Sequence, residues 1–164
     1  MKVLCDTSSA LLLYRTELFI LFAGYFEVCF TEEVYFELQQ EGYYGYEFFK
    51  EEKENSFSIV KVKPLNDNEF SFLHTGEASI IQAYQEGRGD FVLLDDFKGA
   101  RYCRDKRIPY TSALLIPKIL YYNNLINQDF MNQKTSEIID IGRYSKKIIS
   151  YAENANRDNL KFFL

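Results

Sequence analysis

Residues 91–96, Phe91-Val92-Leu93-Leu94-Asp95-Asp96, join an apolar run to two adjacent acids. The same pattern opens the chain, where Met1-Lys2-Val3-Leu4-Cys5 leads into Asp6-Thr7-Ser8-Ser9. Short apolar runs of this kind are typical of buried parallel strands. Ligands of open α/β sheets bind in the crevice at the carboxyl ends of the strands. We therefore expect the acids that follow the two runs to lie at that edge.

Alternating strand and helix patterns predict an α/β fold. Strands are expected at residues 2–5, 27–30, 57–62, 91–94 and 109–110, and helices at 8–14, 17–24, 32–40, 75–86, 98–106 and 112–122. Strands separated by helices imply right-handed crossovers, and so a mainly parallel sheet in a three-layer α/β/α sandwich. Apolar residues within 136–153 predict one further amphipathic helix that continues through Gly142.

The composition is typical of a single folded domain spanning residues 1–164. The chain is 47% hydrophobic and contains 15 Phe and 13 Tyr, which is enough to form a sizeable core. The net charge of −5 argues against a protein that coats nucleic acid. Three cysteines without CxxC spacing favour a reduced, cytoplasmic location. No apolar stretch reaches the roughly 18 residues needed to span a membrane.

Acidic residues recur along the chain at Asp6, Glu37, Glu77 and Asp95-Asp96. Carboxylates gathered at one edge of a sheet repel one another unless a cation offsets their charge. Hard cations such as Mg²⁺ prefer oxygen ligands. The ordered set therefore predicts a metal site.

Four pieces of the sequence carry a resemblance to the PIN domain family of metal-dependent ribonucleases. They are Val3-Leu4-Cys5-Asp6-Thr7-Ser8, Val34-Tyr35-Phe36-Glu37-Leu38, Thr75-Gly76-Glu77-Ala78, and Leu94-Asp95-Asp96-Phe97-Lys98-Gly99-Ala100-Arg101 followed by Ile108-Pro109-Tyr110-Thr111. Their order and spacing are similar to the VapC-like toxin branch of bacteria and archaea. The resemblance covers about residues 1–130 and leaves a tail, about 131–164, without a matching motif. Ser112 stands where that branch usually has Gly.

The resemblance implies an endoribonuclease that hydrolyses RNA phosphodiester bonds with Mg²⁺ or Mn²⁺. It implies catalytic roles for Asp6, Glu37, Glu77 and Asp96, with Asp6 and Asp96 as metal ligands. Glu77 is expected to bind the metal directly or through water, and Glu37 to orient water. Asp95 is either a second ligand or a charge partner of Arg101. The resemblance also implies a toxin role, an antitoxin protein that inhibits it, and a homodimer.

Each acid also has a structural explanation. A helix N-cap explains Asp6 equally well, and Glu77 fits a capping role at a helix start. Glu37 alone is typical of a solvated helix residue. Two adjacent acids after an apolar strand are harder to explain by capping, so the joint pattern favours a metal site. The alternative function is a non-catalytic PIN-like module that binds RNA or a protein partner.

Other α/β sites fit the sequence less well. A haloacid-dehalogenase-like phosphatase needs a second Asp two positions after its nucleophile, where this chain has Ser8. A response-regulator receiver needs its acidic pair near the first strand, whereas the pair here comes late. The sequence contains neither a GxxxxGK[ST] loop nor a GxGxxG fingerprint. His74 is the single histidine, and a lone histidine beside a loop is usually structural.

Substrate contacts are expected from residues close to the acids. Ser8 is expected to hydrogen-bond a ligand carboxylate or a metal-bound water. A basic cluster follows the acidic pair, formed by Lys98, Arg101, Arg104, Lys106 and Arg107. Lys98 and Arg101 have the best claim to bind substrate phosphates, and a solvated helix face is the alternative.

An aromatic cluster at residues 43–49 has acidic neighbours, Glu47, Glu51, Glu52 and Glu54. The negative charge disfavours RNA stacking, so core packing or a protein interface is favoured. This cluster and the tail segment 138–151 are both predicted as surfaces for a homodimer or an antitoxin helix.

Overall fold

The computed structural model describes residues 1–51, 56–64, 70–157 and 160. Within these residues the centre is a five-stranded parallel sheet with the strand order β3-β2-β1-β4-β5. The strands are β1 (Lys2–Cys5), β2 (Glu27–Thr31), β3 (Ser58–Val60), β4 (Phe91–Leu93) and β5 (Tyr110–Thr111). The predicted parallel sheet is therefore confirmed.

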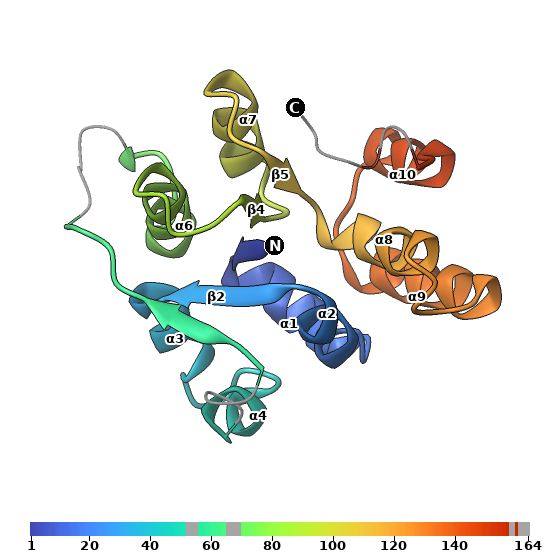
Figure 1. Cartoon of the computed structure of the whole chain (residues 1–164), viewed down its shortest axis with the longest axis horizontal. Helices are drawn as coiled ribbons and strands as arrows, with labels where there is room; N and C mark the ends of the chain where they lie inside the picture. The colour runs from blue at the N-terminus through green and yellow to red at the C-terminus, as the bar shows by residue number, and fades with distance from the viewer. Residues whose placement is uncertain (52–55, 65–69, 158–159, 161–164) are drawn as a thin grey trace.

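Helices cover both faces of the sheet. They are α1 (Thr7–Arg15), α2 (Phe19–Tyr25), α3 (Glu32–Leu38), α4 (Tyr46–Glu51), α6 (Thr75–Gln85), α7 (Phe97–Asp105), α8 (Ile116–Tyr122), α9 (Gln128–Ile141) and α10 (Lys146–Asn154), with a 3-10 turn η2 (Ala113–Leu115) before α8. Figure 1 shows α6 and α7 on one side of the sheet and α1, α2 and α4 on the other. The expected three-layer α/β/α arrangement is confirmed.

The chain reverses its direction of winding between β1 and β4. From β1 it proceeds outward to β2 and β3, and from β4 it proceeds the opposite way to β5. Such a switch point leaves a crevice at the carboxyl ends of the two central strands, because the helices that follow them diverge to opposite faces. Cys5 pairs with Leu93, and the backbone N–H of Asp6 donates to the Leu93 carbonyl at 3.0 Å. The acids after β1 and β4 therefore lie at this crevice.

The aromatic cluster at residues 43–49 contributes to the core. Phe49, on α4, is fully buried, and its ring centroid lies 5.0 Å from that of Phe19. Tyr43 and Tyr44 remain exposed. Core packing therefore accounts for part of the cluster, while Glu52 and Glu54 lie outside the described residues.

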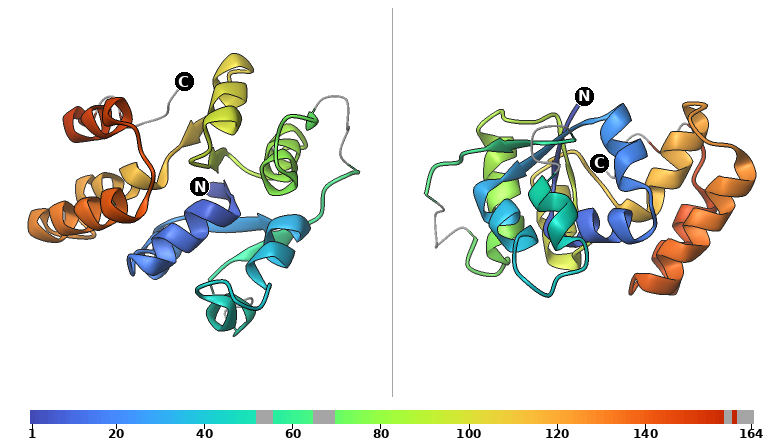
Figure 2. Two further views of the ribbon diagram at one scale, coloured as in Figure 1. Left: turned by 180° about the vertical axis from the view of Figure 1, so that it is seen from behind. Right: turned by 90° about the horizontal axis from the view of Figure 1, so that it is seen from below.

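The tail differs from the prediction of one continuous helix. Gly142 is extended (φ −77°, ψ 152°) and ends α9, and Ser145 caps a separate helix, α10. The sequence did not reveal this break, because the apolar residues on each side of Gly142 have helical spacing. Ile138 is fully buried, so the tail also contributes to the core. Figure 2 shows α8, α9 and α10 grouped at one end of the molecule.

The described helices include none with both the length and the apolar character that a membrane span requires.

Candidate active site

Asp6 lies at the start of α1 with only 3% of its surface exposed. Its Oδ1 accepts the backbone N–H of Ser9 at 2.8 Å, and its Oδ2 accepts the Ser8 hydroxyl at 2.8 Å. The first bond is the predicted N-cap, and the second is the predicted contact of Ser8 with a carboxylate. Burial, with a smaller effect of the charge on Asp95, raises the pKa of Asp6 to about 7. Hydrogen bonds from Ser9 and Ser8 oppose this rise.

Asp95 and Asp6 both accept hydrogen bonds from Ser9. The Ser9 hydroxyl donates to Asp95 Oδ2 at 3.1 Å, and the Ser112 hydroxyl donates to Oδ1. The backbone N–H of Ala113 donates to Oδ2 at 3.3 Å. Burial raises the pKa of Asp95 although these donors stabilise its charge. The open alternative that Asp95 pairs with Arg101 is wrong, because Arg101 instead pairs with Asp105 at 3.8 Å.

Glu77 occupies the first turn of α6 and is 8% exposed. One of its oxygens accepts the backbone N–H of His74 at 3.4 Å, so the predicted capping role is present. Burial is the main cause that raises the pKa of Glu77 to about 7, followed by the charge on Asp96 and, to a smaller extent, on Glu37. Three carboxylates from α3, α6 and the start of α7 therefore interact electrostatically.

Glu37 is half-buried and is held by α1, because the Thr7 hydroxyl donates to its Oε2. It faces the backbone of Gly76, where a Cβ atom would lie 3.1 Å from Oε2. The interpretation of Glu37 as a freely solvated residue therefore does not hold. Its carboxylate lies between the starts of α1 and α6.

Asp96 is the N-cap of α7. Its Oδ1 accepts the backbone N–H groups of Lys98 at 2.7 Å and of Gly99 at 3.1 Å. Helix capping therefore accounts for the hydrogen bonds of one Asp96 oxygen. Asp6 and Glu77 likewise accept backbone N–H groups at the starts of α1 and α6. Three helix N-termini, whose dipoles favour negative charge, therefore meet at this edge of the sheet.

The ordered set of acids predicted a metal site that includes Asp6, Glu77 and Asp96. Among the described residues, no group of three or more His, Cys, Asp or Glu side chains is placed to hold a metal ion. The acids instead form two neighbouring groups, Asp6 with Asp95, and Glu77 with Asp96 and Glu37. The physical reason is that each side chain is also held by the start of a helix, while like charges disfavour closer approach.

A pocket of about 490 Å³ opens beside both groups of acids. Glu77, Asp95 and Asp96 line it together with Ser8, Arg15 of α1 and the segment from Ile141 to Tyr144. The tail is therefore part of the site. The Tyr144 hydroxyl is buried without a hydrogen bond of good geometry. Burial and the negative charge of Asp95 raise the pKa of Tyr144 well above its usual value, which keeps the hydroxyl protonated.

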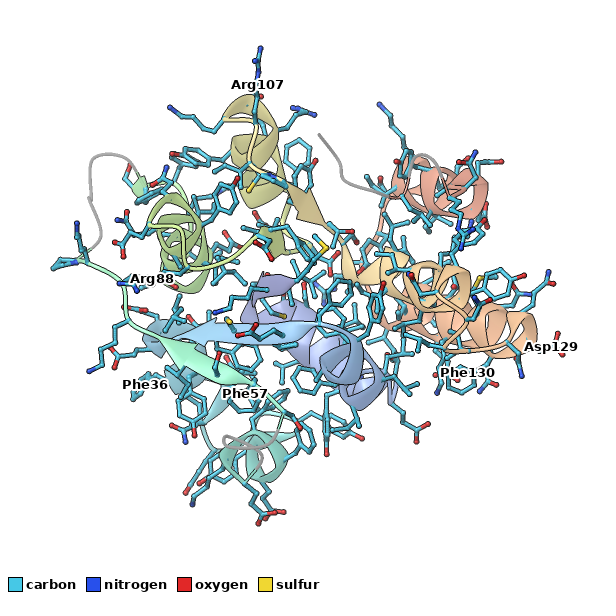
Figure 3. The ribbon with its side chains drawn as sticks, in the orientation of Figure 1. Phe36, Phe57, Arg88, Arg107, Asp129 and Phe130 are labelled. Atoms are coloured by element: carbon cyan, nitrogen blue, oxygen red, sulfur yellow. The ribbon has the colours of Figure 1, made fainter. Side chains whose placement is uncertain are left out.

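The basic cluster on α7 divides into two parts. Lys98 lies near the acids, where its charge opposes the rise in the pKa of Glu77. Arg107, at the other end of the helix, points away from the sheet in Figure 3. Proximity to the acids thus distinguishes Lys98 from the rest of the cluster.

Several polar residues of the site were not predicted. Thr7 and Ser9 stand in the quoted run after β1, and a capping pattern would have identified Ser9 as a donor to Asp6. Ser112 stands where the VapC-like branch usually has Gly, and in the structure its hydroxyl donates a hydrogen bond to Asp95. Arg15, Arg143 and Tyr144 carry no signal in the local sequence, because only tertiary packing brings them to the pocket.

Comparison with known proteins identifies the family. A family model described as "DUF3368: PIN domain" matches residues 2–152, so the chain belongs to the PIN domain family. Members of this family are generally nucleases. No curated protein sequence matches the chain. The structure is similar to one described as "Structure of the PIN domain endonuclease Utp24", with a TM-score of 0.51, 17% identity, and coverage of 68% of this chain and 84% of that one. At this identity the similarity supports the fold.

Proposed function

We propose that this protein is a metal-dependent endoribonuclease whose active site is the acidic crevice between β1 and β4. The observation that carries the proposal is the gathering of five carboxylates at a sheet switch point, with the pKa of both Asp6 and Glu77 raised to about 7. Groups with strongly perturbed pKa values in a pocket are typical of functional sites. Membership of the PIN domain family supports the same activity.

The donor chemistry of the crevice suits a hard divalent cation, although the acids form two groups and no group of three among the described residues is placed to hold a metal. All the candidate donors are carboxylate oxygens, which Mg²⁺ and Mn²⁺ prefer. Burial and mutual repulsion make the acids unfavourable as ions, and a cation would offset both effects. The metal would be held by the two groups together, Asp6 with Asp95 and Glu77 with Asp96, and the Glu37 carboxylate would lie beside them. Gly76 leaves space for the Glu37 carboxylate, since a Cβ there would lie 3.1 Å from it.

In phosphodiester hydrolysis, the chain's own residues would position the metal-binding carboxylates and bind the RNA backbone. A bound Mg²⁺ or Mn²⁺ supplies an activated water and offsets charge on the phosphate oxygens. Ser8, Ser9 and Ser112 hold the carboxylates of Asp6 and Asp95 in place through the hydrogen bonds described above. Lys98, Arg101 and Arg15 supply positive charge at or near the pocket for the RNA backbone.

Cleavage of a fluorescently labelled single-stranded RNA in Mg²⁺, in Mn²⁺ and in EDTA tests the proposal. Asp96→Asn keeps the helix cap, because Asn caps as well as Asp, but removes a metal-binding charge. We expect it to lower the rate by at least about 100-fold, the scale on which a metal contributes several kcal/mol. Asp129→Asn is the matched control, because Asp129 is exposed in the first turn of α9, away from the crevice (Figure 3). Equal activity of the two variants would refute the proposal.

A non-catalytic PIN-like module that binds RNA or protein is the alternative. It predicts that RNA binding is unaffected by Asp96→Asn and that no cleavage occurs with either metal. Measuring binding and cleavage on the same samples separates the two functions.

The toxin role is proposed from the resemblance alone, and the cytoplasmic location from the three cysteines without CxxC spacing. The two surfaces predicted for a homodimer or an antitoxin helix are partly used by the chain itself, since Phe49 and Ile138 are fully buried. The exposed remainder is Tyr43 and Tyr44 near α4 and Ile148 on α10. Sedimentation of the isolated chain at micromolar concentration tests the dimer, and a strict monomer would exclude it.

A further inference from the structure

A second hollow is lined mainly by residues of α7, which begins directly after Asp96. It has a volume of about 370 Å³ and is lined by Phe72, Phe97, Lys98, Arg101, Tyr102 and Asp105. We refer to it as the α7 groove. Phe97 and Lys98 directly follow Asp96 in the sequence, so the groove begins at the acidic site.

Exposed aromatic rings form the walls of the α7 groove. Phe97 is 74% exposed and Phe72 is 46% exposed. The Phe72 ring lies 5.8 Å from that of Tyr102, and Phe70, which is buried, lies 5.9 Å from the same ring. Phe70 thus anchors the turn before α6 while Phe72 faces solvent. Two large apolar rings in one open groove exceed the scattered exposure that a protein surface normally shows.

Cations lie beside these rings. Lys98 is exposed and forms no ion pair with any described residue. Arg101 pairs with Asp105 at 3.8 Å, but both side chains are more than half exposed, so the pair is weak and a phosphate can replace it. The groove therefore combines flat apolar surfaces with positive charge.

We propose that the α7 groove binds the base of an unpaired nucleotide next to the phosphate that is cleaved. Phe97 and Phe72 supply rings on which the base stacks, and Lys98 and Arg101 contact the adjoining phosphates. An apolar peptide would fill the groove but offer no negative charge to Lys98 and Arg101, whereas a nucleotide supplies a base for the rings and a phosphate for the cations. Because bases within a duplex are not available for stacking on protein, the groove selects single-stranded RNA.

This inference rests on the proposed function, but RNA binding in EDTA tests it without cleavage. The probes are a short fluorescein-labelled single-stranded RNA, the same RNA annealed to its complement, and a series of RNAs that each carry one abasic position. Fluorescence anisotropy gives a Kd for each. Loss of one stacked base weakens binding by about 5-fold to about 150-fold. We expect Phe97→Ala to show a loss in this range for single-stranded RNA and none for the duplex.

Further variants of Phe97 distinguish stacking of a base on an aromatic ring from contact with any apolar side chain. Phe97→Tyr should retain the wild-type Kd, whereas Phe97→Leu should lose affinity as Phe97→Ala does. Phe36→Ala should have no effect, because Phe36 is similarly exposed at 70% but lies on α3, away from α7 (Figure 3). Circular dichroism should show all variants folded, since Phe97 contributes little to the core.

A double-mutant cycle gives the decisive result. For one abasic position, the effects of the missing base and of Phe97→Ala should not add, because each removes the same contact. Additive effects at every position, an unchanged Kd for Phe97→Ala, or no RNA binding by the wild type would each overturn the inference. If Phe97→Ala binds and cleaves RNA like the wild type, the nuclease proposal stands and only the groove assignment fails. If binding depends on Phe97 but no metal supports cleavage, the groove stands and the nuclease proposal fails.

Discussion

Replacement of Asp6 by Asn should make the metal-free protein more stable at neutral and alkaline pH. Asp6 is buried, and its pKa rises from 3.8 to about 7. A group of this kind contributes stability while it is protonated. That stability is fully present below pH 3.8 and is lost as the pH rises through about 7. Asn has the shape of the protonated acid and cannot ionise, so the variant should not show this loss.

The size of the effect follows from the two pKa values. A difference of about 3 between them corresponds to about 4 kcal/mol. Most of this falls between about pH 5 and about pH 8, where the linkage relation assigns a loss of roughly 2 to 3 kcal/mol to the wild type. Asn is as good an N-cap as Asp, so the bond from the Ser9 N–H is retained and little is lost from the cap. The stability of Asp6→Asn relative to the wild type should therefore increase by about that amount over this range.

Urea unfolding in EDTA at a series of pH values measures the difference. Glu77 and Asp95 remain in both proteins, so most of their own titration cancels in the comparison. Saturating Mg²⁺ or Mn²⁺ supplies a second test, because about 100-fold excess over Kd stabilises a binding-competent protein by about 2.7 kcal/mol. The wild type should gain this stability and Asp6→Asn should gain much less. Parallel pH profiles for the two proteins, or equal stabilisation by metal, would refute the reasoning.

Two glycines offer further predictions. Gly76→Ala places a Cβ 3.1 Å from Glu37 Oε2, so it should displace that carboxylate and lower RNA cleavage by about 10-fold to about 100-fold, measured as initial rates, with little change in stability. Gly142→Ala should destabilise the protein by about 1 to 3 kcal/mol in urea unfolding, because its Cβ would lie 2.8 Å from a backbone carbonyl and collide with the Tyr144 ring. Gly24→Ala is the control for both, since a Cβ there meets nothing within 4 Å, and we expect a gain of roughly 0.5 to 1 kcal/mol in α2. Unchanged cleavage for Gly76→Ala, or unchanged stability for Gly142→Ala, would contradict these accounts.

Local patterns in the sequence were sufficient for the sheet and for the position of the acids. The runs before Asp6 and Asp95 are apolar because parallel strands are buried on both faces, so the strands could be recognised without any tertiary information. The N-cap of α3 at Thr31 could be predicted for a similar reason, since capping depends on residues three apart. Once the strands were assigned as parallel, their carboxyl ends had to share one edge.

Contacts between distant segments could not be predicted in this way. Gly142 has an ordinary φ angle, and the close approach that requires a glycine there could not be predicted, because a Cβ would lie 2.8 Å from the Ile138 carbonyl and collide with the ring of Tyr144. Tyr144 and Arg143 reach the acidic pocket only because α9 packs against α1 and α8. The separation of the acids into two groups likewise depends on three helix starts that compete for their oxygens. Periodicity reports which face of an element is apolar, but packing in three dimensions decides which distant side chain that face meets.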